Sequence, residues 1–197
     1  LEKLVAAARN RKLIASGDRG EASIKGNVVG MALFCRLFDD GKLLKKPDGS
    51  EVELVIRQPD PALFPILDRV LPTGAGTLNF IDYTARRIVE SKQLLAQLPA
   101  KKVKASLIMT LADDNVGVLA QSTTRHIDTL IREIRKLGWD GFSTRYWIPG
   151  ELDSTVHYLS QAAWDPKTTR DSAHHDLWEG ILGNRAGSER LLIGWNH

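Results

Sequence analysis

The fold class depends on the stretch Val103-Lys104-Ala105-Ser106-Leu107-Ile108-Met109-Thr110-Leu111, which is typical of a buried strand. A shorter strand is predicted at 116–119, and residues 125–137 then predict a helix that ends at Gly138. The apolar side chains of this helix recur on one stripe, at Ile127, Leu130, Ile131, Ile134 and Leu137. The next strand is predicted at Gly141-Phe142-Ser143-Thr144-Arg145-Tyr146-Trp147. Strand, helix and strand at this spacing predict a right-handed β/α crossover and a parallel sheet.

Two further helices are predicted after this stretch. Asp153 or Ser154 caps one that ends before Pro166, and Thr168 with Asp171 forms a capping box for another near 169–182. Repeated β/α units predict an α/β fold of the (β/α)8-barrel type. Because a complete barrel takes about 250 residues, the 197 residues would form a partial barrel or a segment of a longer chain. A small open doubly wound sheet is the alternative architecture.

Residues 1–76 predict a first part of the chain, separate from the β/α units of residues 77–197. It contains an amphipathic helix at 1–15, a strand at 28–38 that is too apolar to have a wet face, and short strands at 42–44 and 51–56. Residues 57–76 are rich in proline and glycine, which favours a linker or a long functional loop. The second part then opens with a long helix at 77–98, ended by Pro99.

Composition narrows the class of protein. With 43% hydrophobic and 26% charged residues, the chain resembles an ordinary globular protein. No apolar run approaches the roughly 20 residues of a membrane helix, so no membrane span is expected. The single cysteine, Cys35, excludes an internal disulfide and is expected to be a buried, inert thiol. The net charge of +3 is small, and the basic clusters are interpreted mainly as solvated surface rather than a nucleic-acid interface.

Candidate functional side chains gather where the predicted strands end, as in most α/β folds. The adjacent carboxylates Asp113 and Asp114 would repel each other, which can raise one pKa enough to make a proton donor. Glu151 follows the next strand and is the candidate base or nucleophile. The candidate substrate-binding side chains are Arg145, Tyr146, Trp147, Asn115 and Gln121. Aromatic rings stack on sugar faces, and a guanidinium pairs with carboxylates.

The histidines do not predict a metal site. His174 and His175 are neighbours that project about 100° apart on a helix, so they cannot chelate one ion together. Their spacing from His126 and His157 matches no known ligand pattern. Neither a metal nor another cofactor is therefore expected.

From about residue 103 onward the chain resembles the late β/α units of barrel glycoside hydrolases of the α-glucuronidase and hexosaminidase types. The resemblance is carried by residues 107–119, by the stretch 138–147, and by Tyr158-Leu159-Ser160-Gln161-Ala162-Ala163-Trp164-Asp165-Pro166. It implies that strand-end carboxylates act as general acid and base while Trp, Tyr and Arg hold the sugar. The matching positions here are Asp113 or Asp114 and Glu151, with Arg145, Tyr146 and Trp147 as the sugar contacts.

Three functions therefore remain as hypotheses. The first is a glycoside hydrolase, or a segment of one, acting on a carbohydrate substrate. The second is a non-catalytic carbohydrate- or protein-binding module, and the third is a basic nucleic-acid-associated protein. Residue 1 already lies in helical periodicity, and the C-terminal residues lack a stop signal, so the remainder of a longer chain or a second subunit is an expected partner.

Overall fold

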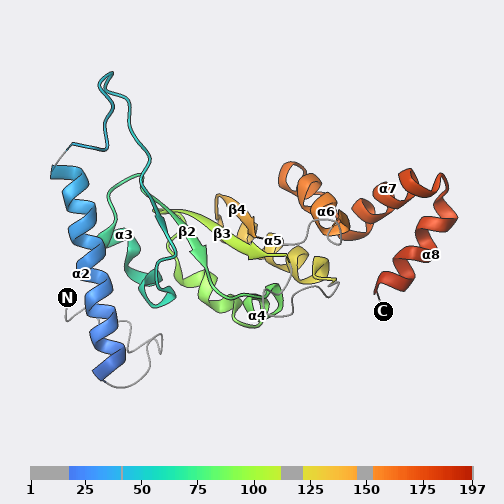
Figure 1. The fold of residues 1–197 in the computed structure, drawn as a ribbon, viewed down its shortest axis with the longest axis horizontal. Helices are drawn as coiled ribbons and strands as arrows, with labels where there is room; N and C mark the ends of the chain where they lie inside the picture. Colours follow the sequence, from blue (N-terminus) through green and yellow to red (C-terminus); the bar gives the residue numbers. More distant parts are fainter. Residues whose placement is uncertain (1–17, 41, 112–121, 146–152, 197) are drawn as a thin grey trace. The chain divides into compact units, whose positions relative to one another are not determined.

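The computed structural model describes residues 18–40, 42–111, 122–145 and 153–196 (Figure 1). The predicted helix at 1–15 and the short strand at 116–119 lie outside these residues. The chain divides into two compact units. The first comprises Leu1–Ile81, Lys92–Ile108 and Lys136–Ser143, and the second comprises Asp82–Ser91, Met109–Arg135 and Thr144–His197.

A four-stranded parallel sheet organises the chain, which confirms the predicted α/β class. Its strands are β1 (Val55–Arg57), β2 (Gly76–Phe80), β3 (Lys104–Thr110) and β4 (Gly141–Arg145), in that order across the sheet. Val55 pairs with Gly76, and Gly76 pairs in turn with Lys104. The two strands predicted around 103–111 and from 141 onward are therefore confirmed, although residues 146–147 are not described.

Each crossover joins a strand to its immediate neighbour. The short helices η1 (Pro61–Ile66) and α3 (Leu67–Val70) link β1 to β2, and α4 (Ala85–Glu90) with η2 (Lys92–Gln97) link β2 to β3. Helix α5 (Thr124–Leu137) lies in the connection from β3 to β4. When each right-handed crossover leads to the next strand on the same side, all the crossover helices lie on one face of the sheet. Barrels and each half of a doubly wound sheet share this order, and a closed barrel is not shown.

The two faces of the sheet differ in burial. Because side chains alternate along a strand, Thr77, Asn79, Ala105 and Leu107 share one face, where each is at most 2% exposed. On the other face Leu78, Phe80 and Ser106 are only half-buried. Ile108 and Thr110 of β3 lie on this second face too and are buried, so the face is less completely covered only around Leu78, Phe80 and Ser106.

Helix α5 matches its prediction closely. Ile127, Leu130, Ile131 and Ile134 form the predicted stripe and are at most 2% exposed. Gly138 follows the helix with φ of 77°, a left-handed conformation that glycine adopts without steric cost. The long, regular apolar period was enough to specify this helix from sequence.

The predicted strand at 28–38 is wrong, because these residues belong to the helix α2 (Asp18–Asp40). Val28 and Cys35 are buried and Met31 and Phe38 half-buried, a spacing that gives one helical stripe. The helix packs through contacts with η1 and α3. Cys35 is 4% exposed, and burial raises the pKa of its thiol, as expected for an inert cysteine. In the described part of the chain, no helix has the length and apolar character needed to cross a membrane.

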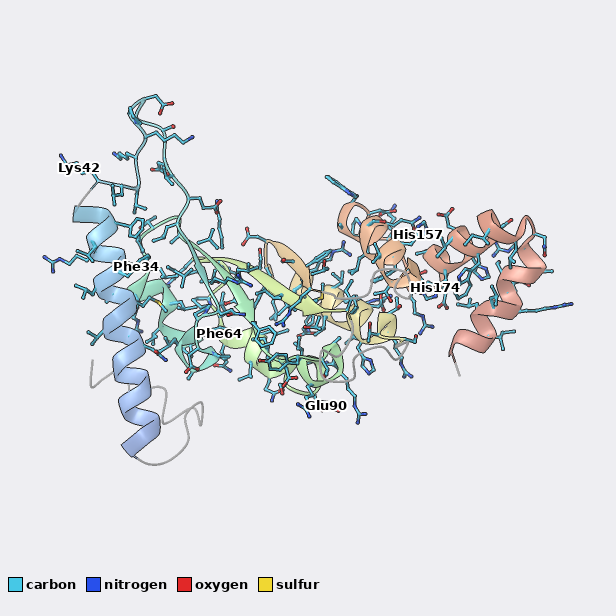
Figure 2. The ribbon with its side chains drawn as sticks, viewed as in Figure 1. Phe34, Lys42, Phe64, Glu90, His157 and His174 are labelled. Atoms are coloured by element: carbon cyan, nitrogen blue, oxygen red, sulfur yellow. The ribbon has the colours of Figure 1, made fainter. Side chains whose placement is uncertain are left out.

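Residues 57–76 do not form the predicted long loop. Asp60 caps η1 by accepting a 2.9 Å hydrogen bond from the amide of Ala62, and Pro61 supplies the first helical position. Leu63, Phe64 (Figure 2) and Leu67 are at most 1% exposed, so the segment is a crossover that supplies core side chains. Proline here begins the helical turns instead of preventing them.

The predicted helix at 77–98 is also wrong. Its first residues form β2, and α4 begins only after Thr84, whose hydroxyl accepts a 3.1 Å hydrogen bond from the amide of Arg87. Ala85, Ile88 and Leu95 are buried as the helical period required. Leu78 and Ile81 fit the same helical period by coincidence, although they lie in a strand and in the turn that follows it. The sequence therefore assigned them wrongly to the helix.

After β4 the chain forms α6 (Asp153–Trp164), α7 (Arg170–Leu182) and α8 (Arg185–Asn196). The first two helices were predicted, but the capping box was placed one residue too early. Thr169 and Ser172 form it: the Thr169 hydroxyl accepts from the Ser172 amide at 3.0 Å, and the Ser172 hydroxyl accepts from the Thr169 amide at 3.0 Å.

The capping assignment gives a direct test of helix α7. Thr169→Ala should lower the free energy of unfolding by about 1 kcal/mol, because the Ser172 amide at the helix start loses the Thr169 hydroxyl that accepts its hydrogen bond. Urea denaturation followed by circular dichroism measures the change. The matched control is Thr168→Ala, which should be nearly neutral, and an equal loss in both variants would contradict the assignment.

Candidate functional site

The carboxyl ends of parallel strands lie at one edge of a sheet, and function usually collects there. Strand β2 leads at this edge into the turn Asp82-Tyr83-Thr84, with which the second unit begins. Strand β4 ends at Arg145, whose carbonyl accepts a 2.9 Å hydrogen bond from the amide of Leu111. This hydrogen bond joins the end of β4 to the residue that follows β3, although the two lie more than 30 positions apart in the sequence.

The centre of this region is a cation–π pair. The guanidinium carbon of Arg145 lies 5.8 Å from the centroid of the Tyr83 ring. Arg145 is half-buried at the strand end, and Tyr83 is 46% exposed. An aromatic ring with an accessible surface and a planar cation beside it can together contact a ligand that has an apolar face and an anionic group.

The turn that carries Tyr83 is fixed by its neighbours. The Asp82 carboxylate accepts a 3.2 Å hydrogen bond from the Thr84 amide, and Thr84 in turn caps α4. Arg87 places a guanidinium nitrogen 3.9 Å from the same carboxylate. Because both residues that flank Tyr83 accept hydrogen bonds from backbone amides, the backbone of the turn that carries its ring is ordered.

Hydroxyl groups connect the end of β3 to the helices that follow. Thr123 donates a 2.6 Å hydrogen bond to the carbonyl of Leu111, and the buried hydroxyls of Thr124 and Thr155 lie 2.8 Å apart. Thr110 is fully buried at the end of β3, and its hydroxyl oxygen has no hydrogen-bond partner among the described residues. These contacts join α5 to β3 and to α6, and they position the start of both helices.

Of the residues proposed from sequence, only Arg145 is described. Asp113, Asp114, Asn115 and Gln121 belong to the segment after β3, and Tyr146, Trp147 and Glu151 to the segment after β4, both outside the described residues. Their roles stay predictions. Tyr83 was missed because its segment was assigned to a helix. The capping sequence Asp82-Tyr83-Thr84 would have indicated the turn.

Two histidines have perturbed acidity. Burial, and then the nearby cation Arg125, lower the pKa of His126 in the first turn of α5. Burial lowers the pKa of His174 in α7 to about 4. Within the described ranges, no three His, Cys, Asp or Glu side chains gather as metal ligands would.

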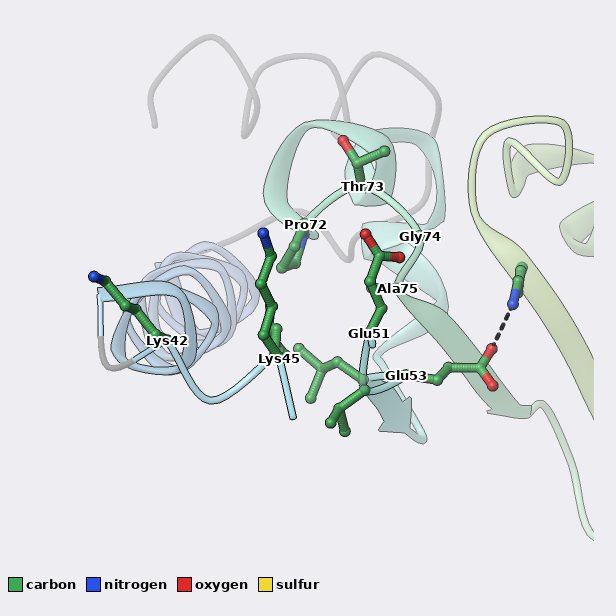
Figure 3. A pocket seen from close by; sticks show the side chains of 12 residues that line it. Lys42, Lys45, Glu51, Glu53, Pro72, Thr73, Gly74 and Ala75 are labelled. Carbon is green, nitrogen blue, oxygen red and sulfur yellow. Dashed lines mark hydrogen bonds and ion pairs between the residues drawn. The ribbon is translucent and has the colours of Figure 1, made fainter. Parts of the chain in front are cut away.

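A groove of about 1140 Å³ lies in the first unit, at the amino ends of β2 and β3 (Figure 3). Its charged rim includes Lys45 and Glu51 on a hairpin, and Glu53, which forms a 3.0 Å ion pair with Lys104. Leu54 and Ala75 contribute apolar surface. No aromatic side chain lines it among the described residues, so it lacks a stacking surface for a sugar ring.

Several basic residues from the clusters noted in the sequence are paired with carboxylates. Lys102 contacts Asp68 at 2.7 Å, and Arg132 contacts Asp128 at 3.1 Å. Such pairs reduce the positive charge that phosphates could contact, and the interpretation of the clusters as surface stays a prediction. Comparisons of the chain with protein-family models, with curated proteins and with solved structures found no match.

Proposed function

We propose that the chain is a glycoside hydrolase, or a segment of one, that binds its sugar at the Tyr83–Arg145 pair. The observation that carries this proposal is the guanidinium of Arg145 beside the partly exposed ring of Tyr83 at the carboxyl ends of two strands. A pyranose has an apolar face that can stack on the ring, and a carboxylate substituent would pair with the guanidinium.

The catalytic groups in this proposal come from the two segments next to the pair. Asp113 or Asp114 follows β3 and acts as the general acid, and Glu151 follows β4 and acts as the base or nucleophile. Glycoside hydrolysis needs two carboxyl groups that flank one bond. Neighbouring parallel strands, such as β3 and β4, are a usual source of such a pair.

The strand order supports a barrel as the proposed architecture. Successive strands are spatial neighbours throughout β1-β2-β3-β4, as they are in a (β/α)8 barrel. The half-buried face with Leu78, Phe80 and Ser106 would then be barrel interior. Parallel sheets are normally covered on both faces, and an open doubly wound sheet would need helices on that second face.

A non-catalytic carbohydrate-binding module is the second candidate. The Tyr83–Arg145 pair would serve it equally well, because stacking and ion pairing require no acid or base. Binding without turnover distinguishes this function from the first.

The test begins with binding and turnover on a panel of neutral and uronic-acid glycosides. Arg145→Ala should weaken affinity for an acidic sugar by about 10- to 100-fold, the usual cost of a hydrogen-bonded charge pair. The affinity of Arg145→Lys should lie between those of the parent chain and Arg145→Ala, because lysine keeps the positive charge but lacks the planar guanidinium group. Isothermal titration or KM values measure the change.

The matched control is Arg86→Ala. Arg86 is an exposed arginine of α4 that pairs with Glu90 at 2.9 Å. Unchanged affinity in Arg145→Ala, or an equal loss in the Arg86 variant, would remove the support that this pair gives to the proposal.

A further inference from the structure

Trp164, the last residue of α6, is 90% exposed. Trp139 and Trp178, by contrast, are only 6% and 8% exposed. A tryptophan usually buries about 150–250 Å² and dominates the contacts that it makes. An indole held almost entirely in solvent is therefore a surface available for a ligand.

The position of this ring is fixed by the helix that carries it. On the opposite side of α6, Tyr158 is 1% exposed and donates a 2.7 Å hydrogen bond to Asp128 of α5. Ala162 is fully buried, and its carbonyl accepts a hydrogen bond from Arg135. Two residues further along a helix is a rotation of about 200°, so Trp164 projects away from this buried side.

The chain after Trp164 forms a tight polar turn. The Asp165 amide donates to the carbonyl of Gln161 at 3.0 Å, and the Asp165 carboxylate accepts from the Lys167 amide at 2.8 Å. Because the turn is closed by its own hydrogen bonds, the ring is presented by a pre-ordered backbone. Such an arrangement lowers the entropy lost when a ligand binds.

The surroundings of the ring favour one class of ligand. The exposed residues that flank it in sequence include the polar Ser160, Asp165 and Lys167, which offer hydroxyl, carboxylate and ammonium groups, and the small apolar Ala163 and Pro166. An apolar protein partner would require a contiguous apolar patch of several hundred Å². A sugar ring needs one apolar plane with hydrogen-bonding groups around its rim, and this combination is present here.

We infer that Trp164 is a carbohydrate-stacking position, additional to the Tyr83–Arg145 pair, which holds a neighbouring part of a polysaccharide without taking part in catalysis. Trp164 closes α6 and is not part of the Tyr83–Arg145 pair, so the ligand that we assign to both positions is an extended chain rather than a single sugar. The inference rests on the proposed function for its ligand class. Stacking on Trp164, however, does not require the catalytic acid or base.

The test compares a long ligand with a short one. Affinity electrophoresis of the full chain through gels that contain soluble polysaccharides should show retardation, and Trp164→Ala should weaken it about tenfold. Trp164→Phe should retain part of the retardation, because a flat ring remains. Ile181→Ala, which removes another exposed apolar side chain of α7, is the matched control and should leave retardation unchanged.

Two further readouts separate this inference from the proposed function. Turnover of a short glycoside should be unaffected by Trp164→Ala, since that substrate would occupy only the Tyr83–Arg145 region. Retardation that depends on Trp164 in a chain with no glycosidase activity would support the inference and count against the hydrolase. Retardation that is absent or indifferent to Trp164, or a change only in oligomeric state by size-exclusion chromatography, would overturn it.

Discussion

Asp114→Asn and Glu151→Gln are each expected to lower kcat on a glycoside substrate by about 10²- to 10⁴-fold, the usual contribution of a positioned proton donor or acceptor. The amide replacements keep the size of the side chains but cannot transfer a proton. Both residues are predicted from the sequence to follow neighbouring strands of the sheet. Steady-state kinetics on the best substrate from the panel measure the loss.

The controls separate chemistry from folding. The control variants are Asp48→Asn and Glu189→Gln. Asp48 lies in an exposed hairpin turn, and Glu189 pairs with Arg185 on α8, so both variants replace carboxylates that the proposal does not use. Their activity should match that of the parent chain, and all variants should unfold at the same urea concentration. Asp113→Asn decides which of the adjacent aspartates is the acid. Full turnover in Glu151→Gln, or in both aspartate variants, would show that the catalytic assignment is wrong.

The sequence predicted the second half of the described sheet because its signals there are long and mutually consistent. Strand β3, helix α5 and strand β4 each carry a clear period, and Gly138 separates the last two with a conformation that suits glycine. Each local preference agrees with the tertiary fold, so the pattern alone was sufficient.

The first half failed where two periods are compatible with the same residues. The run at 28–38 has a single charged residue, Arg36, which is too little to distinguish a buried strand from a helix, and the structure shows that the run belongs to α2. Leu78 and Ile81 fit the helical period of the residues that follow, yet hydrogen bonds from β1 and β3 place Leu78 in a strand. Pairing between distant segments cannot be read from a local window.

The candidate site was predicted only in part, for a related reason. Arg145 could be identified because it ends a recognisable strand. Tyr83 could not, because its proximity to Arg145 depends on the order of the strands and on the turn that Asp82 and Thr84 stabilise. A contact between residues from two crossovers becomes visible only when the sheet topology is known.

The helices after β4 are expected to lose stability in acid because of His174 (Figure 2). His174 is buried, with a solvent exposure of 0%, and its ring lies 4.9 Å from that of Trp178. Burial is the main cause that lowers its pKa to about 4; Arg170, His157 and His175 lower it further, while Asp171 opposes them. The folded state therefore requires a neutral imidazole.

The direction of the pH effect follows from the two states. An unfolded histidine has a pKa of about 6.5. Below about pH 6.5 the unfolded chain therefore binds a proton at this residue, whereas the folded chain does not bind it until the pH is lower. The contribution of neutral His174 is complete above about pH 6.5 and is lost progressively as the pH falls to about 4. A tenfold difference in proton affinity corresponds to about 1.4 kcal/mol, so the loss from this residue amounts to about 3 kcal/mol.

Urea denaturation at pH 7, 5.5 and 4, followed by circular dichroism, measures this dependence. His174→Gln carries no titratable ring, so its unfolding free energy should fall by about 3 kcal/mol less than that of the parent chain over the same interval. His175→Gln is the matched control, because it changes the adjacent histidine, which bonds to Ser188 at 2.8 Å, and keeps His174. If both variants follow the parent curve, protonation of His174 is not what weakens these helices, and the carboxylates of their ion pairs become the groups to test.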